Sequence, residues 1–334
     1  MRNLGAVLVL VLFASACGGR QPVAPSPPSA VVADGSPQAT NYLNEIIGLM
    51  QSNSINRSQI NWTDFRAQIF ARAQGAQTIA DTYPAIALAL GLLGDRHSFY
   101  TAAGGSGIGN PSGRRCAAAS VSAPVLPADI GYVRVAGFGG TDAAAVRAFA
   151  DSVQDQIRTG DRPTLVGWIV DLRGNGGGNM WPMLAGVGPV LGDGTAGYFI
   201  SPDGFSSEWG YSNGASTVNG NAQARVSSVY ILVRTAPRVA VLTDHLVASS
   251  GEAVAIAFRA RPNARSFGAA TCGLSTANQS YRLSDGAMLY LTVAVMADRT
   301  RTSYGDSIAP DEIVSGDGEV VERAIAWLRA FSST

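Results

Sequence analysis

The chain has 334 residues, of which 46% are hydrophobic and 14% charged, so it is long enough and apolar enough to bury a substantial core. Its 24 basic residues balance its 24 acidic ones without any basic run, which argues against nucleic acid or an anionic surface as a partner. Every basic residue is arginine, and arginine stays protonated in proteins, so a mechanism with a neutral lysine as base is excluded.

The first 17 residues have the pattern of an export signal. Arg2 precedes an apolar run over residues 4–13, which is too short to span a membrane, and small residues then lead to Cys17. The end of this segment resembles a bacterial lipoprotein signal, although Ala14 stands where leucine is usual. We expect either lipidation of Cys17 or plain secretion. Both place the mature protein outside the cytoplasm, and lipidation would anchor it to the membrane, facing the periplasm or the cell exterior.

Residues 18–38 are rich in Pro, Gly, Ser and Ala and predict an extended linker without a core. Residues 39–100 predict a small helical domain, with helices that begin near Thr40, Thr63 and residues 81–82.

A polar cluster, Asp95 to Tyr100, follows the last of these helices and contains His97, one of only two histidines in the chain. Taken alone, His97 is more simply explained as a residue that satisfies the helix C-terminus. Its position at a helix exit also makes it a candidate site residue.

The remainder, residues 101–334, predicts an α/β domain in which strands alternate with helices, with parallel strands in the centre and a hairpin turned at Asp285-Gly286. A polar stretch over residues 201–223 is expected to be irregular. The expected strands are residues 130–135, 164–172, 198–200, 227–233, 239–242, 265–268, 281–283 and 288–295, and the expected helices are residues 143–157, 180–191 and 318–331.

A glycine-rich loop, Arg173 to Asn179, follows the most apolar of these strands. Its consecutive glycines let the backbone approach another group closely and direct N–H groups at it. The pattern lacks the spacing of a phosphate-binding loop, so an oxyanion-binding loop is the better functional interpretation. The alternative is a tight turn before the next helix.

The strand over residues 239–242 ends in a polar turn that carries His245, Ser249, Ser250 and Glu252 before a helix begins. A serine at such a turn is exposed, and the free N–H groups of the helix start favour an anion, which suits a nucleophile. The simpler alternative is that one serine caps the helix while Glu252 completes a capping box.

Several blocks together resemble the tail-specific, or carboxyl-terminal processing, serine proteases. These blocks are LLGDRHSFY from Leu92, VDLRGNGGG from Val170, VLTDHLVASSGEAVAIAF from Val241, SFGAATCGLS from Ser266 and IAPD from Ile308. The resemblance implies a crotonase-like spiral of βαβ units, a serine nucleophile at a helix start and cleavage of peptides near a free C-terminus.

Carried over by position, the nucleophile of that family falls on Ser249. Its oxyanion donors fall on Gly176 or Gly177 and on the backbone N–H of Ser250. The lysine that many members use as base falls on Leu274, so a Ser–Lys dyad cannot operate in this chain.

Only His97 and His245 titrate in the range that a base needs. The tricorn core protease branch of the family uses a histidine that maps onto His97, so His97 is preferred and His245 is the alternative. The acid that orients this base is open, because the tricorn-type glutamate maps near Tyr304. The candidates are Asp306, Asp298 and Asp95, or Ser98 and Asn278 by hydrogen bonding.

Too few residues separate Tyr100 from Ile130 for the PDZ module of many family members, which is therefore expected to be absent. Cys116 and Cys272 remain after Cys17 is set aside. In an exported protein they could form a disulfide that fixes the loop beside Ser249, although the sequence cannot give their separation.

The sequence thus predicts an exported serine peptidase that uses a Ser–His mechanism, acts on peptide or protein substrates and needs no cofactor or metal. The alternative is a non-catalytic or weakly catalytic protein on the same fold that binds peptides or apolar ligands. The missing lysine and the missing PDZ module motivate this second hypothesis.

Overall fold

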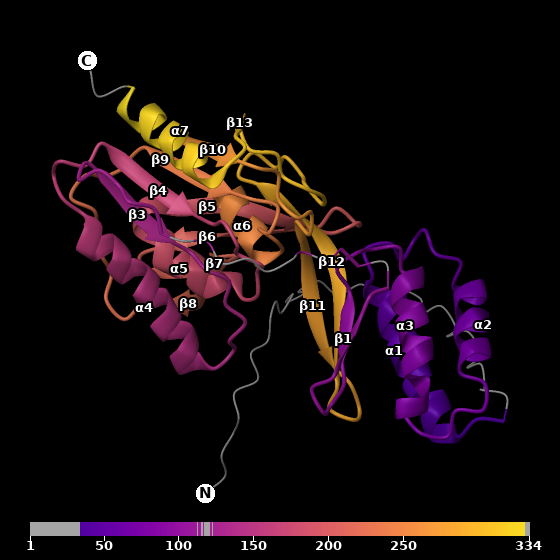
Figure 1. The fold of residues 1–334 in the computed structure, drawn as a ribbon. Helices are drawn as coiled ribbons and strands as arrows, with labels where there is room; N and C mark the ends of the chain where they lie inside the picture. The colour runs from indigo at the N-terminus through magenta and orange to yellow at the C-terminus, as the bar shows by residue number, and fades with distance from the viewer. Residues whose placement is uncertain (1–33, 112, 115, 117–120, 122, 331–334) are drawn as a thin grey trace, which may run out of the picture. The chain divides into compact units, whose positions relative to one another are not determined.

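The computed structural model describes residues 34–111, 113, 114, 116, 121 and 123–330 (Figure 1). The predicted signal segment, Cys17 and most of the predicted linker lie outside these residues. The chain divides into two compact units, each described by itself below. The first takes the chain up to Gly113 together with Asn278–Val293, and the second takes Arg114–Ala277 and the chain from Ala294 onward.

The first unit contains three α-helices, α1 (Pro37–Asn53), α2 (Trp62–Arg72) and α3 (Tyr83–Leu92), with a short 3-10 helix η1 (Ala80–Thr82) before α3. The predicted start near Thr40 is three residues late, and the predicted start near Thr63 is one residue late. Ser36 caps α1 by accepting from the Ala39 N–H, and Pro37 supplies a backbone angle that suits the first turn. Asn61 caps α2 in the same way.

This unit also takes a hairpin from far along the chain, which the predicted boundary at residue 100 does not include. The hairpin joins β11 (Thr276–Arg282) to β12 (Met288–Asp298), and β12 pairs antiparallel with β1 (Phe99–Thr101), which in turn pairs with β2 (Gly107–Gly109). The buried side chains of Leu289 and Leu291 belong to the same core as the helices. Burial of these side chains explains why the hairpin joins the helical unit.

The second unit is built on a parallel five-stranded sheet in the order β13-β10-β9-β4-β3. The central strand β9 and its neighbour β4 are buried along their whole length, and their side chains point alternately into two cores. In β9, Val239 and Val241 face one core while Ala240 and Leu242 face the other. The strands are β3 (Ile130–Arg134), β4 (Gly167–Asp171), β9 (Val239–Thr243), β10 (Ala264–Gly268) and β13 (Glu312–Ile313).

Helices cover both faces of this sheet, as the predicted α/β class requires (Figure 1). The larger core lies under α4 (Ala143–Gly160), α5 (Met180–Leu191) and α6 (Ser250–Ala257), and the smaller core lies under α7 (Asp317–Arg329). Because the strands are parallel, the segments that follow β4 and β9 meet at one edge of the sheet. These segments are the glycine-rich loop and the serine turn.

The polar stretch over residues 201–223, expected to be irregular, instead forms antiparallel strands. They are β6 (Ser206–Ser212), β7 (Ala215–Val218) and β8 (Asn221–Arg225), which continue from β5 (Gly194–Ile200). The Asn213-Gly214 and Asn219-Gly220 turns have positive φ at both residues, the geometry of a tight hairpin turn. Conversely, residues 227–233, expected to form a strand, contain no regular strand.

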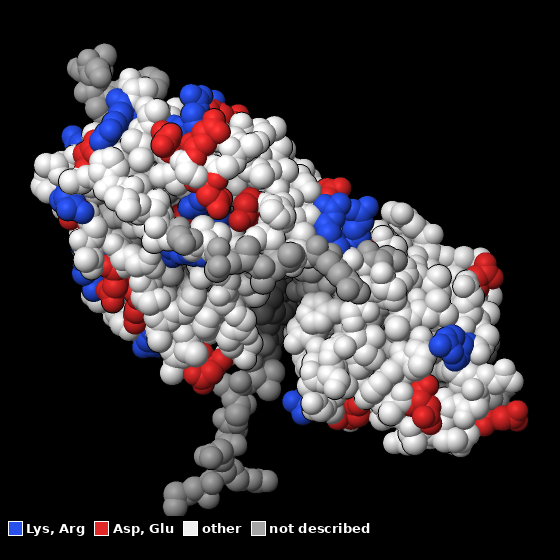
Figure 2. Space-filling model, viewed as in Figure 1, with Lys and Arg blue, Asp and Glu red and all other residues white. Residues whose placement is uncertain are grey.

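Figure 2 shows that most of the visible surface is uncharged and that acidic and basic side chains are interspersed on it. This distribution agrees with the balanced composition. Within the described part of the chain, no helix is long and apolar enough to cross a membrane.

Candidate active site

Ser249 lies at the junction of β9 and α6 in a strained backbone conformation. Its φ is 51° and its ψ is −116°, which a residue with a side chain rarely adopts. Such a conformation costs on the order of 1–3 kcal/mol and persists only where the surroundings impose it. The side chain is half-buried at the start of α6, so the turn presents a serine at a helix N-terminus, as a nucleophile requires.

The glycine-rich loop after β4 packs directly against this turn. A Cβ at Gly177 would lie 2.7 Å from the Ala248 carbonyl oxygen and 2.9 Å from the Ser249 Cβ, so only glycine fits there. The Ser250 hydroxyl donates to the Gly178 carbonyl at 2.7 Å. The hydroxyl of Ser250 is therefore used to hold the two segments together.

Of the predicted oxyanion donors, Gly177 does not have an available N–H group. It donates to the Asn175 Oδ1 at 2.9 Å. The N–H groups of Gly176 and Ser250 make no hydrogen bond to other groups among the described residues. Of the predicted donors, Gly176 and Ser250 therefore have N–H groups that are available to an acceptor.

The capping box expected as the simpler alternative is present, but Glu252 does more than cap the helix. Its side chain is fully buried and accepts four hydrogen bonds. The donors are the Ser249 N–H at 2.8 Å, the Thr271 hydroxyl at 2.5 Å, the Gly273 N–H at 2.8 Å and the Leu274 N–H at 2.7 Å. Burial raises the pKa of the Glu252 carboxyl, and these hydrogen bonds oppose that rise. Glu252 thus joins the backbone of Ser249 to the loop where the family lysine would lie.

A disulfide also attaches the loop that contains Cys272 to the segment around Cys116. Cys116 and Cys272 are bonded, with their Cα atoms 5.9 Å apart. The N–H of Cys272 donates to the Val247 carbonyl at 2.8 Å, and the Arg114 guanidinium donates to the Cys272 carbonyl at 2.5 Å. The loop opposite Ser249 is therefore attached at several points within one unit.

Two polar residues that the sequence analysis did not single out, Asn175 and Asp244, bind the backbone of the loops that follow β4 and β9. Asn175 is fully buried, and its carbonyl accepts from the Ala248 N–H at 3.0 Å. The Asp244 carboxylate accepts from the N–H groups of Gly174, Leu246 and Val247. An Asp or Asn that binds the backbone two residues ahead is a known turn signal, and both residues lie in the segment that follows a strand. That signal was available in the sequence.

His97 belongs to the first unit, where a buried network fixes its main chain. Asp95 accepts from the His97 N–H at 2.9 Å and from the Ser98 N–H and hydroxyl, each at 2.7 Å. The Asn278 side chain donates to the His97 carbonyl at 2.9 Å, and the Thr292 hydroxyl donates to both Asp95 and Asn278. Asp95, Ser98 and Asn278 thus hold the His97 backbone and the turn around it.

Burial lowers the pKa of His97 to about 4, although the nearby Asp95 carboxylate acts in the opposite direction. The imidazole is therefore neutral at pH 7 and able to accept a proton.

The remaining candidates are engaged elsewhere. Asp306 pairs with Arg114 at 2.9 Å, and Asp298 accepts from Thr300, Thr302 and Tyr304. Burial alone would raise the pKa of Asp298, but these hydrogen bonds outweigh it and lower the pKa.

His245 is exposed on the turn after β9, four positions before Ser249.

The Asp171–Arg173 ion pair at the start of the glycine-rich loop is buried, and the Tyr132 hydroxyl also donates to the Asp171 carboxylate. It supports the loop rather than presenting a charge to a ligand. Among the described residues, no group of three or more His, Cys, Asp or Glu side chains could hold a metal ion.

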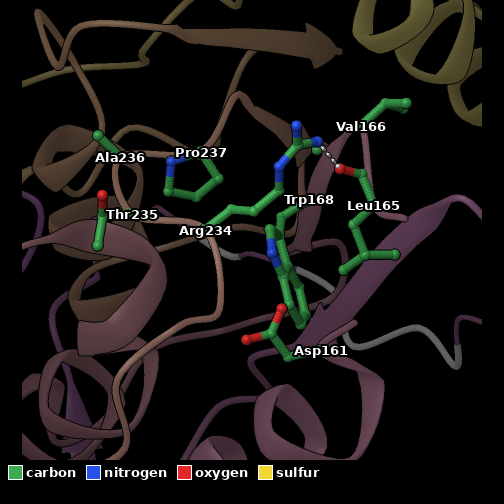
Figure 3. Close-up of a pocket in the computed structure, with 9 residues that line it drawn as sticks. Asp161, Leu165, Val166, Trp168, Arg234, Thr235, Ala236 and Pro237 are labelled. Carbon is green, nitrogen blue, oxygen red and sulfur yellow. Dashed lines mark hydrogen bonds between the residues drawn. The ribbon is translucent and has the colours of Figure 1, made fainter. Parts of the chain in front are cut away.

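A separate cavity of about 190 Å³ lies at the opposite, amino end of β4 and β9 (Figure 3). Asp161, Trp168 and Arg234 line it, and the Arg234 guanidinium is hydrogen-bonded to the Leu165 carbonyl at 2.9 Å. The cavity contains none of the predicted site residues. It is not part of the serine site.

Three comparisons relate this chain to known proteins. The model of peptidase family S41 matches residues 129–314, more than half of the chain. A nisin-resistance protein of Lactococcus lactis subsp. lactis is 26% identical over 294 residues, which cover 88% of this chain and 88% of that protein.

Solved structures show the same mixed α/β fold with a parallel sheet and N-terminal helices. A lipoprotein from Streptococcus agalactiae matches with a TM-score of 0.69 at 21% identity, over 88% of this chain and 97% of the other. The photosystem II D1 C-terminal processing protease matches with a TM-score of 0.52 at 16% identity, over 86% of this chain and 97% of the other.

Proposed function

Because the chain belongs to peptidase family S41, the serine peptidases of the carboxyl-terminal processing type, we propose that Ser249 is its nucleophile and His97 its general base. The observation that carries the proposal is the strained Ser249 turn, which packs against the glycine-rich loop and leaves two N–H groups available. A nucleophile beside preorganised N–H donors is the arrangement that acyl transfer requires.

His97 is the better base for two reasons. The chain contains no lysine, and the other histidine, His245, is exposed on the turn. The lowered pKa of His97 keeps its imidazole neutral at pH 7, so it can take the Ser249 proton without first losing one. The tricorn-type histidine base stays part of this proposal, and so does the crotonase-like spiral, which the βαβ units of the parallel sheet support.

The proposed reaction has two steps. The Ser249 Oγ attacks the scissile carbonyl carbon while its proton passes to His97, and the oxyanion that forms accepts from the N–H groups of Gly176 and Ser250. His97 then gives that proton to the leaving amine as the C–N bond breaks. Water, deprotonated by His97, attacks the acyl ester and releases Ser249 and the carboxylic acid product.

We further propose that the protein is exported and anchored by lipid at Cys17, since residues 1–17 have the pattern of a lipoprotein signal and one similar structure is that of a lipoprotein. Its substrates are peptides. The similarity to a nisin-resistance protein makes nisin the first peptide to test.

A fluorophosphonate probe, which reacts only with activated serines, tests the nucleophile. We expect labelling of the wild type, loss of labelling in Ser249→Ala, and a fall in peptide hydrolysis of ~10³-fold or more. His245→Ala is the control and should behave as the wild type. A folded wild type that is not labelled and hydrolyses no peptide would instead favour the alternative, a binding protein on this fold.

A further inference from the structure

The guanidinium of Arg114 is oriented through only one of its three nitrogens. Three oxygen atoms surround Nη1, namely the Cys272 carbonyl oxygen at 2.5 Å, the Asp306 Oδ1 at 2.9 Å and the Ser307 hydroxyl at 3.0 Å. The Nε and Nη2 groups make no hydrogen bond to other described residues. Because the Arg114 side chain is 29% exposed, it is held in place and still accessible to a ligand.

Gly273, in the loop of Cys272, makes room for this guanidinium. Its φ is 96°, and a Cβ at this position would overlap the Arg114 Nη1 and lie 2.6 Å from the Asp306 Oδ1. A residue with a side chain would therefore displace the guanidinium. The loop is thus adapted to hold Arg114 in this place.

The same loop lies next to the proposed nucleophile. Glu252 accepts from the Gly273 N–H through Oε1 and from the Ser249 N–H through Oε2, each at 2.8 Å. Two such hydrogen bonds to one carboxylate keep the two backbone nitrogens within about 8 Å of each other. Arg114 and these three residues belong to the same unit. An oriented cation is therefore fixed close to Ser249.

We propose that Arg114 binds a carboxylate of the peptide substrate through Nε and Nη2, and so helps to select which peptide bond is cleaved. The two N–H groups along this edge match the spacing of the two carboxylate oxygens. An extended peptide advances about 3.3 Å per residue, so the carboxylate belongs to a residue within a few positions of the scissile bond. This inference rests on the proposed function, since it assigns a specificity residue beside the proposed nucleophile.

The ion pair with Asp306 is compatible with this role. Asp306 contacts the guanidinium at Nη1, and its side chain is 68% exposed, so water and salt screen its charge. The Nε and Nη2 edge is left to a second carboxylate. Both the free C-terminus of a peptide and an Asp or Glu side chain carry this group, and the experiment distinguishes them.

The kinetics of matched peptides test the proposal. One peptide is synthesised with a free C-terminal carboxylate, with a C-terminal amide, and with a C-terminal amide that follows a glutamate. We expect the wild type to hydrolyse one of the two carboxylate forms with a kcat/KM ~10-fold or more above that of the plain amide, because hydrogen bonds to charged groups are strong. Preference for the first form identifies the C-terminus as the ligand, and preference for the third identifies an acidic side chain.

Substitution of Arg114 should remove this preference. In Arg114→Gln we expect all three forms to be hydrolysed about equally, whereas Arg114→Lys, which keeps the charge but loses the paired N–H groups, should retain part of the preference. Arg259→Gln is the matched control and should retain all of it. Arg259 also pairs with an aspartate, Asp311, but it lies beyond the C-terminal end of α6, whereas Ser249 precedes the other end.

Fluorophosphonate labelling of Ser249 separates this inference from the proposed function, because the probe carries no carboxylate. Labelling of Arg114→Gln at the wild-type rate would show that the Ser249 turn is intact. Equal hydrolysis of the three peptides by a wild type that is labelled, or a full preference in Arg114→Gln, would overturn the role of Arg114 and leave the nucleophile in place. A wild type that is not labelled and hydrolyses no peptide would overturn both.

Discussion

The turns that carry Ser249 and His97 are held in the same way, although they belong to different units. In each, a buried carboxylate accepts the backbone N–H of the proposed catalytic residue and three further hydrogen bonds. Glu252 holds Ser249, and Asp95 holds His97. In both cases the carboxylate fixes the main chain rather than the reacting atom.

The difference lies in where the partners come from. Glu252 bonds to a loop within the same unit that a disulfide also attaches, whereas Asp95 bonds to Thr292 on a distant hairpin. The turn of the nucleophile is therefore fixed by covalent and local contacts, and the turn of the base depends on the hairpin staying packed on the helices. We expect the Ser249 side of the site to be the more rigid of the two.

The largest expected effect separates the two histidines. His97→Ala should lower kcat/KM by ~10³-fold or more because the proposed base is lost, while His245→Ala should leave it unchanged. Steady-state hydrolysis of a peptide measures both. Equal and large losses in the two variants would show that the base had been wrongly assigned.

Removal of the disulfide tests whether covalent attachment matters on the Ser249 side. Cys116→Ser with Cys272→Ser opens a link between residues 156 positions apart, so the free energy of unfolding should fall by about 2–5 kcal/mol. Urea unfolding measures this change. Cys17→Ser, which retains the bridge, is the control and should unfold as the wild type does.

The two carboxylates can be compared by amide substitution. Glu252→Gln and Asp95→Asn keep the volume but replace an acceptor oxygen with an N–H₂ group that faces donors, so each should destabilise the protein by about 1–3 kcal/mol. If the Ser249 side is the more rigid, Glu252→Gln should slow fluorophosphonate labelling of Ser249. Asp95→Asn should lower kcat and should destabilise the protein less than Glu252→Gln does. A larger loss of stability in Asp95→Asn, with labelling of Glu252→Gln unchanged, would contradict the comparison.

The smallest effect is the pH dependence. Since the pKa of His97 lies at about 4, kcat/KM should stay level from pH 8 to about pH 5 and fall only below that. The unfolded chain binds this proton near pH 6.5, so the stability contributed by His97 is complete above that pH and decreases as the pH falls towards 4. An acid limb with its midpoint near 6.5 would mean that His97 titrates as an unburied histidine.

Much of the fold could be predicted from periodicity. Unbroken apolar runs marked the buried strands β4 and β9, and the alternation of strands with helices gave the α/β class with N-terminal helices, which the structures of relatives confirm. The strands β6, β7 and β8 were missed because their residues are mostly polar. The Asn-Gly turns that close two of their hairpins were the available signal.

The extra role of Glu252 could not be predicted in the same way. A capping box specifies one local hydrogen bond for the glutamate side chain, whereas the other partners of Glu252 lie about twenty residues further along the chain. Likewise, the loss of Gly177 as an oxyanion donor depends on the direction of one N–H group. The sequence offers Asn175 as a possible turn residue, but only the structure shows that its side chain takes the Gly177 N–H.

The sequence by itself determined which chemistry is possible: it contains no lysine, two histidines, a serine at a strand-to-helix turn, and a glycine-rich loop after another strand. Residue types and local periodicity fix such properties because they depend on covalent structure and short-range backbone preferences. Only the tertiary structure decided which N–H groups stay available, that Cys116 meets Cys272, and that residues 278–293 join the helical unit. Those outcomes depend on contacts between distant segments, which form only when the cores pack.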